Sequence, residues 1–573
     1  MSTEIENDFG NMSPDETKKE KHSQLMVQTE DIEEDSSNGS NQHYSPQDST
    51  KQRAGKIADK ASLAHDALYS DPEKAKLLKS GTRKLDWTVV PPLLLMWLAN
   101  FIDRSNAGNA RIAGLTKDLG MVGMQFNTAL AVFYVTYILV ELPSNIILKK
   151  VGGNIWLPTI TFVWGAVTAC TAATRNYAGF LVIRLVLGLA EGGLLGGITL
   201  YLSTLYPRFQ IQQRVARFYA AAALAGSFGG LLAAGLTSLD TNGIEGWRWL
   251  YIVEGVITCG FAIFAIIIMP NSVLKTRYLN EEERKVCQEA LEVDVGVGAY
   301  TYRLLDKPNE KADAHGSDAE IGERTITHGH EEQFEWYEVQ RGALDIQTWL
   351  TGILYLCVCC SLYSITLFLP TILRGVFPDS TQTRVQLLTV PPFVPAAIMV
   401  LIVAYFSDKT KMRGPYIMAF LPISIIGYII LVATKDNNAR YAAVFLVCFG
   451  IYPAIPCILT LIANNSAGHY KRATSTAMQL MIANGAGFIA TFIYDENKFG
   501  GAKGYVVPHA IVLACLCLGW ICISLNVLYC YRENAARTAG KRDGNIAAYE
   551  ELVKQGITKA PIGDRHPGFR FSL

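Results

Sequence analysis

Charged residues are scarce in this sequence. Asp, Glu, Lys and Arg make up 18% of the 573 residues, whereas 50% are hydrophobic, and soluble proteins carry roughly 25% charged residues. Outside residues 1–85, 272–343 and 532–573, the charges fall in short stretches between apolar runs of about 20 residues, the length that a helix needs to cross a bilayer. This pattern excludes a soluble fold and indicates a membrane protein with many spans.

Features of several other protein classes are also missing. The formal net charge is zero, so the sequence gives no electrostatic reason to bind nucleic acid. It contains no Gly-x-x-x-x-Gly-Lys-Ser/Thr loop to hold ATP phosphates, and no His pair with metal-ligand spacing lies in an apolar run. We therefore expect no enzyme activity, no cofactor and no metal site.

The cysteines and the first residues add two further exclusions. All cysteines except Cys287 lie in or beside apolar runs, so we interpret them as packing residues and not as a disulfide framework. Residues 1–85 lack the apolar core of a signal peptide and are rich in Ser, Asn, Gln and acidic residues. A disordered cytosolic tail is therefore expected there.

The apolar segments predict twelve spans in two six-helix halves, at 86–271 and 344–531. They begin near Trp87, Phe126, Ile155, Ala178, Tyr219 and Leu250, and again near Trp349, Val385, Pro415, Tyr441, Ala473 and Tyr505. An even number of spans places both ends of the chain on one side. The short loops on that side carry Lys and Arg, which favours the cytosol; these residues are Lys149, Lys150, Arg208, Arg214, Arg217, Lys409, Lys411, Arg413, Lys471 and Arg472.

The central stretch at 272–343 is expected to be a cytosolic loop, and residues 532–573 a cytosolic tail. Asn280 followed by three Glu residues indicates a helix start, because the Asn side chain can cap free amides and the acids oppose the positive helix end. Residues 293–333 have no apolar period and are expected to be disordered. Phe334 and Trp336 then suggest an interfacial segment before the seventh span.

Ionisable residues in the middle of two spans are the main functional signal, because a charge at the bilayer centre costs roughly 2.5–3.5 kcal/mol. Span one contains Asp103 next to Arg104, and span four contains Arg184 and Glu191 seven residues apart. Two helical turns separate that pair, so both side chains face the same way. Structural ion pairs and groups lining a cavity are both possible, and we favour the cavity.

Other polar residues leave their alternatives open. Glu141 and Glu254 are placed near the membrane edges, where a loop Arg or Lys can pair with them, so gating or structural roles are favoured over substrate contact. Tyr134, Tyr137, Gln479 and Asn484 serve equally well as pocket donors or as interhelical hydrogen-bond partners. The small-residue rows of span four (Gly188, Gly192, Gly196) and span five (Gly226, Gly229, Gly230) predict that these two spans pack closely together.

Four stretches resemble a known family: Leu98 to Arg111, Arg184 to Glu191, Gly246 to Gly255, and Phe334-Glu-Trp336. With the twelve spans and the long central loop, they resemble the major facilitator superfamily, specifically its anion:cation symporter family and the fungal allantoate permease group. That group includes nicotinate, pantothenate and biotin transporters. The resemblance implies an all-α polytopic fold with two six-helix halves.

The resemblance also implies roles for individual residues. Asp103 and Glu191 match acids that couple transport to protons, and Arg104 and Arg184 match bases that recognise an anionic substrate; Tyr137, Gln479 and Asn484 are further candidates for the substrate site. The inner-loop motif of the superfamily has Gly and Asp where this chain has Glu141 and Asn145. Its counterpart in the second half keeps Asp408, near Arg413, and we take all four residues as gating candidates.

The predicted function is proton-coupled symport of a small organic anion, such as a nicotinate-like vitamin carboxylate or allantoate, into a fungal cell. Its partners are then the anion, protons and the lipid bilayer, with no nucleic acid, and the chain is expected to act as a monomer in the plasma membrane. Two alternatives stay open: a transporter-like nutrient receptor that does not transport, and a drug/proton antiporter.

Overall fold

The computed structural model describes residues 71–239, 244–291, 335–494, 505–558, 560 and 562–573. Its regular elements there are all helices, which confirms the all-α fold class. Among the described residues, eleven helices are long and apolar enough to span a membrane, and α5 adds a twelfth span that is bent by 47° between Glu141 and Pro143. A proline inside a helix removes one backbone hydrogen bond and produces such kinks.

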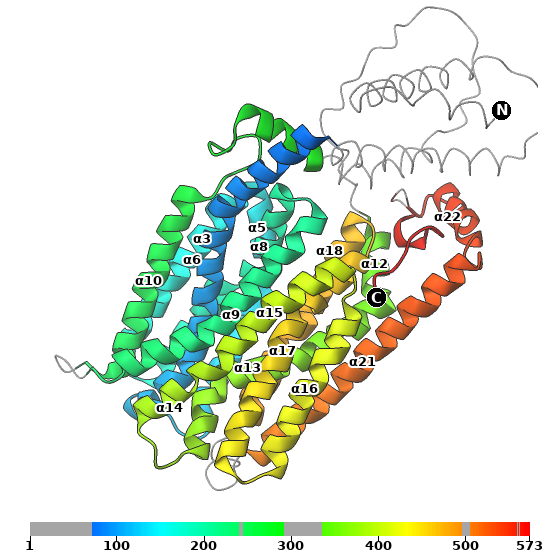
Figure 1. Ribbon diagram of the computed structural model, residues 1–573. Helices are drawn as coiled ribbons and strands as arrows, with labels where there is room; N and C mark the ends of the chain where they lie inside the picture. The colour runs from blue at the N-terminus through cyan, green and yellow to red at the C-terminus, as the bar shows by residue number, and fades with distance from the viewer. Residues whose placement is uncertain (1–70, 240–243, 292–334, 495–504, 559, 561) are drawn as a thin grey trace, which may run out of the picture. The chain divides into compact units, whose positions relative to one another are not determined.

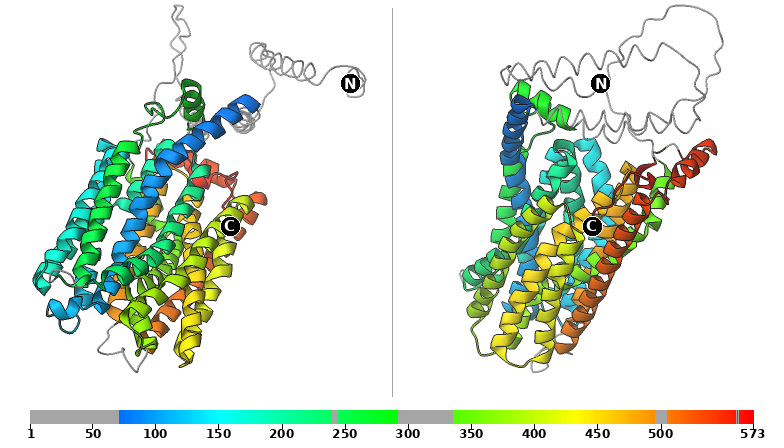
Figure 2. Two further views of the ribbon diagram at one scale, coloured as in Figure 1. Left: turned by 60° about the vertical axis from the view of Figure 1, so that its left-hand side comes forward. Right: turned by 45° about the vertical axis from the view of Figure 1, so that its right-hand side comes forward.

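The helices run alongside one another in two groups, which Figures 1 and 2 show from three directions. The first half consists of α3 (Pro72–Ile112), α4 (Leu115–Asp118), α5 (Gln125–Val151), α6 (Gly153–Cys170), η1 (Thr171–Ala173), α7 (Tyr177–Glu191), α8 (Leu194–Leu205), α9 (Arg208–Leu236) and α10 (Gly246–Ile268). The second half consists of α12 (Trp336–Leu344), α13 (Ile346–Val376), α14 (Gln382–Leu388), α15 (Val390–Thr410), α16 (Gly414–Ala433), α17 (Asn437–Asn465), α18 (His469–Asn484), α19 (Ala486–Ile493), α21 (Val506–Thr538), α22 (Gly544–Lys554) and η3 (Gly563–Arg565).

The first span begins earlier than expected. Helix α3 starts at Pro72, so the tail boundary predicted at residue 85 lies inside a helix. The Asp71 side chain accepts hydrogen bonds from the free amides of Glu73 and Lys74, and a proline at the first helical position needs no partner for its nitrogen. Of the predicted disordered segments, residues 1–70 and 293–333 lie outside the described residues.

A helix over residues 281–291 holds the polar start of α3 in place. The Asn280 backbone N–H donates to Glu283 at 3.0 Å, so this helix begins where the sequence predicted. Lys84 of α3 pairs with Glu283 at 2.8 Å, and Lys74 pairs with Glu289 at 3.0 Å. Helix α3 thus has more than three turns before its apolar span begins, and these contacts hold that part in place.

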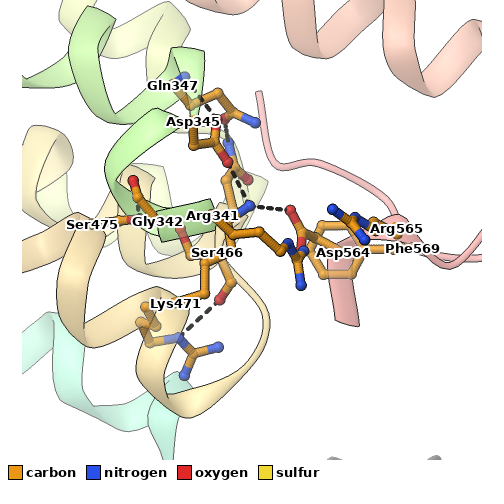
Figure 3. A network of polar contacts seen from close by, with 12 residues as sticks. Arg341, Gly342, Asp345, Gln347, Ser466, Lys471, Ser475, Asp564, Arg565 and Phe569 are labelled. Carbon is orange, nitrogen blue, oxygen red and sulfur yellow. Dashed lines mark hydrogen bonds and ion pairs between the residues drawn. The ribbon is translucent and has the colours of Figure 1, made fainter. Parts of the chain in front are cut away.

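The last residues fold back onto the second half. Helix α21 continues to Thr538, past the tail boundary expected at 532, and the segment 562–573 then reaches α12 and the start of α18. Asp564 of this segment pairs with Arg341 of α12 at 2.5 Å and with Lys471 of α18, which also pairs with Asp345 at 2.5 Å (Figure 3). Thus the segment 562–573 is packed against protein and not a loose tail.

The two halves are in close contact at the end of the bundle where α3 ends, near α4 and α14; we call this the α4 side and the opposite end the α12 side. A Cβ on Gly108 of α3 would lie 2.3 Å from the Leu367 carbonyl oxygen of α13, and one on Gly226 of α9 would lie 2.4 Å from the Phe393 ring of α15. Ser227 also donates to the Val390 carbonyl at 2.9 Å. Small residues on α3 and α9 therefore let the two halves pack closely against each other on the α4 side.

The glycine rows have different partners from those predicted. A Cβ on Gly188 would lie 2.3 Å from the Phe133 carbonyl oxygen, and one on Gly192 would lie 2.8 Å from the Tyr137 carbonyl oxygen. Span four therefore packs its glycines against α5, whereas Gly226 of span five faces the second half. The expectation that spans four and five use these rows to pack on each other was wrong, because each row faces a different neighbour.

Candidate functional site

Two arginine–carboxylate pairs connect α3 and α7 in the interior of the first half. Arg104 lies 2.6 Å from Glu191, measured between Nη2 and Oε1, and its Nε donates to the same oxygen at 3.2 Å. Asn100, one turn earlier on α3, donates to Glu191 at 2.5 Å. All three side chains are buried, so Glu191 receives charge-assisted hydrogen bonds in a region without bulk water.

The second pair is longer and has more neutral partners. Arg184 Nη1 lies 3.9 Å from Asp103 Oδ1, and Arg184 Nη2 donates to the Tyr251 hydroxyl at 2.9 Å. The other oxygen of Asp103 accepts from Trp164 at 2.8 Å and from Thr168 at 2.9 Å, both on α6. Arg184 is therefore attached more loosely to its acid than Arg104 is.

These pairs resolve the question of what the span-four charges face. Arg184 and Glu191 do point the same way, toward α3, as the seven-residue spacing predicted. They are in ion pairs and they also line a cavity, so the two interpretations are both correct in part. Helix α7 ends at Glu191, where Gly193 adopts a left-handed conformation with φ of 90° that suits glycine.

Aromatic rings surround the Arg104 guanidinium. Its carbon lies 5.5 Å from the Phe101 ring, 5.7 Å from Phe133, 5.5 Å from Tyr137 and 5.6 Å from Tyr363. The negative faces of such rings attract a cation, and a desolvated contact contributes about 2 kcal/mol. Because Tyr363 belongs to α13, the second half supplies part of this environment.

A chain of hydrogen bonds links the two halves through this point. Arg104 donates to the Tyr363 hydroxyl at 3.4 Å, and that hydroxyl donates to the Asn484 side-chain oxygen at 3.1 Å. The Asn484 amide donates to Glu141 Oε2 at 3.4 Å. The chain starts at Glu191, passes through the second half, and returns to the first half at the bend in α5.

Two adjoining cavities open beside these groups. One has about 360 Å³ of space, its open mouth included, and is lined by Trp97, Phe101, Arg104, Tyr137, Leu195, Tyr219, Tyr355, Cys359, Leu362, Tyr363, Leu480, Ala483 and Asn484. The other has about 300 Å³, measured in the same way, and is lined by Asp103, Arg104, Leu130, Phe133, Tyr134, Arg184, Glu191 and Leu367. Arg104 borders both, with aromatic rings on one side and carboxylates on the other.

The structure brings most of the predicted site residues together. Asp103, Arg104, Arg184 and Glu191 line one cavity, and Tyr137 and Asn484 line the other. Gln479 lies elsewhere: it is fully buried, and its amide donates to the Ile458 carbonyl of α17 at 3.3 Å.

The two acids expected at the membrane edges are both buried. Glu141 bonds to Asn484 in the other half, and Glu254 lies more than two turns inside α10, where it accepts a hydrogen bond from Asn106 at 2.9 Å. Neither of these two hydrogen bonds comes from a loop Arg or Lys. Glu254 lies deeper in its helix than expected because α10 begins at Gly246, before the apolar run that marked its start in the sequence.

The remaining gating candidates lie on the α12 side. The Asn145 amide donates to the Glu141 backbone carbonyl at 2.9 Å, one turn back on α5. Asp408 and Arg413 form an ion pair at 2.8 Å, and Arg413 also donates to Ser407 at 2.7 Å. The backbone N–H of Arg413 donates to the Leu573 carbonyl at 2.5 Å, so the C-terminal segment touches this motif.

Several residues of the site were not found by sequence reasoning. Tyr363 has only uncharged neighbours in sequence and gave no signal, and Trp164 and Thr168 look like ordinary span residues. Tyr251 lies inside the quoted stretch Gly246 to Gly255, one turn before Glu254, and that proximity was the available signal. Among the described residues, no group of three or more His, Cys, Asp or Glu is placed to hold a metal ion.

Comparison with known proteins agrees with this architecture. A family profile described as Major Facilitator Superfamily matches residues 93–491. An uncharacterized transporter of Schizosaccharomyces pombe is 32% identical, over 88% of this chain and 92% of its own, and an MFS-type transporter of Penicillium expansum is 33% identical over the same shares. The high-affinity nicotinic acid transporter of Saccharomyces cerevisiae is 29% identical, over 86% of this chain and 84% of its own.

A solved structure has the same fold at much lower identity. A bacterial homologue of the human lysosomal transporter Spinster, in an inward-facing and occupied conformation, has a TM-score of 0.52 and 14% identity, covering 78% of this chain and 96% of its own.

Proposed function

The chain belongs to the major facilitator superfamily of membrane transporters, and from this premise we propose that it carries a small organic anion into the cell together with protons. The family assignment makes it a solute transporter in a membrane, not an enzyme. The direction, the coupling ion and the substrate are our proposal. We place it in the plasma membrane, with the α12 side and both ends of the chain in the cytosol.

The observation that carries this proposal is the Arg104–Glu191 pair at the border of the two cavities. A guanidinium offers a planar set of donors that fits a carboxylate. A substrate carboxylate that enters the larger cavity can replace Glu191 at Arg104, and the aromatic rings of Tyr137 and Tyr363 can hold its apolar part. Asn484 would supply a polar contact from the second half.

Proton coupling follows from the charge that this exchange displaces. Once Arg104 binds the substrate, Glu191 is a buried carboxylate without its cation, and such a charge is costly. If Glu191 takes up a proton, the site with substrate, Arg104 and Glu191 regains its earlier net charge. The same argument applies to Arg184 and Asp103. One bound anion therefore brings one proton, and both leave together on the cytosolic side.

We propose a nicotinate-like vitamin carboxylate or allantoate as the substrate class. The aromatic lining of the larger cavity suits a planar ring that bears a carboxylate. The relative named as a nicotinic acid transporter supports this class at 29% identity. We also propose that Glu141, Asn145, Asp408 and Arg413 control opening on the α12 side. Glu141 lies at the bend of α5 and Asn145 one turn beyond it, and the Asp408–Arg413 pair joins the last turn of α15 to the start of α16.

Uptake by the purified full chain in liposomes tests the proposal. We expect labelled nicotinate or allantoate to accumulate when the outside is made acidic, and the accumulation to disappear when an ionophore removes the pH step; liposomes without protein are the control. Pantothenate, biotin and an uncharged analogue, nicotinamide, define the substrate. Binding without accumulation would indicate a receptor, and accumulation only with the inside acidic would indicate an antiporter; either result would refute symport.

A further inference from the structure

Glu254 is a buried acid that the site described above does not use. It lies on α10 with 4% of its surface exposed. Its Oε2 accepts one hydrogen bond, from the Asn106 amide of α3 at 2.9 Å. Within the described part of the chain its other oxygen, Oε1, is buried and has no hydrogen-bond partner. A carboxylate with so few donors is poorly suited to remain charged.

The charges in the cluster of Asp103, Arg104, Arg184, Glu191 and Glu254 do not balance unless a proton is present. The two cations, Arg104 and Arg184, are already paired with Glu191 and Asp103. Glu254 is the third carboxyl of this cluster, so two positive charges stand against three acids. An unpaired buried carboxylate costs several kcal/mol, and a bound proton removes that cost.

The groups that face Glu254 come from two of the helices around it. Among the described residues, Asp103 of α3 and Glu191 of α7 are like-charged groups that act on it, and Arg184 of α7 is a cation that does so. Helix α6 contains no Asp, Glu, Lys, Arg or His. Helix α9 carries its arginines in the first ten residues, far along the helix from Gly229, where it meets Asn106.

The hydrogen-bond donors around Glu191, Asp103 and Glu254 determine which of these three acids holds the proton. Glu191 accepts from Asn100 and twice from Arg104, and Asp103 accepts from Trp164 and Thr168 beside Arg184. Glu254 accepts from one neutral amide. The charged form is favoured where donors are most numerous, so the proton belongs on Glu254.

We propose that Glu254 is a proton-binding site of the transport cycle, one that shares a single proton with Asp103 under the control of Arg184; this inference rests on the proposed proton coupling. Arg184 lies close to both acids, since it is paired with Asp103 and bonded to Tyr251, which is one turn from Glu254 on α10. When Arg184 turns toward Glu254, the O–H bond of Glu254 breaks and one forms on Asp103. Asp103 lines a cavity, so it can pass the proton to solution.

Two measurements on the reconstituted full chain test this site. Infrared spectra should show the carbonyl band of a protonated carboxylic acid in the wild type, and Glu254→Gln should remove it. In flux assays with labelled nicotinate, Glu254→Gln should keep exchange at equal concentrations but lose at least about tenfold of the uptake driven by an acid-outside step, because Gln imitates the protonated form and cannot release a proton. Glu254→Asp should retain both activities.

Glu281→Gln is the matched control, because it makes the same change on an exposed side chain of the helix 281–291. A band of unchanged intensity in Glu254→Gln would overturn the inference, since Glu254 would then contribute no protonated carboxyl. Normal driven uptake by Glu254→Gln would overturn it too, since the proton would then be static. Absence of proton-driven uptake in the wild type would refute symport itself, and the infrared band would still decide whether Glu254 holds a proton.

Discussion

Asn127 of α5 donates its side-chain amide to the backbone oxygen of Thr491 at 2.6 Å, across the boundary between the two halves. The same amide reaches the Tyr494 oxygen at 3.0 Å, and the Asn127 side chain is only 1% exposed. Close by, a Cβ on Gly487 would lie 2.5 Å from the Tyr134 ring. One side chain therefore satisfies two carbonyls of the opposite half on the α4 side, and alternating access requires this contact to break.

Asn127→Ala should weaken closure of the α4 side. The substitution leaves two buried carbonyls without their donor in the closed state, at a cost of about 1–3 kcal/mol each, whereas water can bind them when that side opens. Spin labels at Val122 and Asp379, one in each half, should report a larger population of long distances. Asn437→Ala, at an exposed position on the same side, should leave the distances unchanged; unchanged distances in the Asn127 variant would refute the role.

Arg184→Ala should abolish binding of the anion without loss of expression. The substitution leaves Asp103 without its cation and the cavity without one of its two positive charges, so we expect affinity to fall by roughly 30-fold or more, equivalent to about 2 kcal/mol. Lys should restore only part of it, because an ammonium lacks the planar fork. Equilibrium binding of labelled substrate measures this, with the exposed Arg217→Ala as control; normal affinity in the Ala variant would remove Arg184 from the site.

Glu191→Gln should separate exchange from accumulation. Gln has the size and hydrogen-bonding ability of the protonated acid, so the loaded carrier can still change its orientation, but no proton is gained or lost at this position. Exchange of labelled substrate at equal concentrations should persist, and uptake driven by a pH step should fail. If both activities survive, Asp103 becomes the leading coupling acid; if binding is also lost, Glu191 has a structural or substrate-contact role.

Glu283→Gln should make stability depend less on pH. Burial alone would raise the pKa of Glu283, but Lys84, the Asn280 N–H and Ser80 together hold it below its ordinary value of 4.5. The folded protein thus favours the charged form, which stabilises it above the usual Glu pKa and loses this effect as the pH falls through the lower folded value. In detergent the wild type should melt a few degrees above the variant at neutral pH, and the gap should close in acid; Glu281→Gln should show no gap.

Asp564→Asn should loosen the segment 562–573. It weakens the ion pairs with Arg341 and Lys471, whose side chains are only 10% and 4% exposed, so their charges lose compensation. Trypsin should then cut after Arg565 and Arg570 faster than in the wild type, as read by mass spectrometry. Glu551→Gln on the exposed face of α22 is the control, and equal cutting rates in all three proteins would show that Asp564 does not hold the segment.

Sequence reasoning located the charged centre because charges inside apolar spans must find partners. Asp103, Arg104, Arg184 and Glu191 can be identified in this way without any knowledge of helix orientation. It could not place Gln479, whose direction depends on the rotation of α18, nor Tyr363, a neutral residue that matters only because α13 faces Arg104. The depth of Glu254 was missed for a related reason, since polar and aromatic residues lengthen α10 before its apolar run.

Each half holds its own end of the segment that connects them. The helix 281–291 is tied to α3 through Glu283 and Glu289, and α12 is tied to α18 and the last residues through Arg341 and Asp564. A backbone cut between residues 292 and 334 would therefore leave both sets of contacts intact. The gene can in principle be divided there into two separately translated pieces that meet in the membrane, which would let each half be labelled or replaced independently of the other.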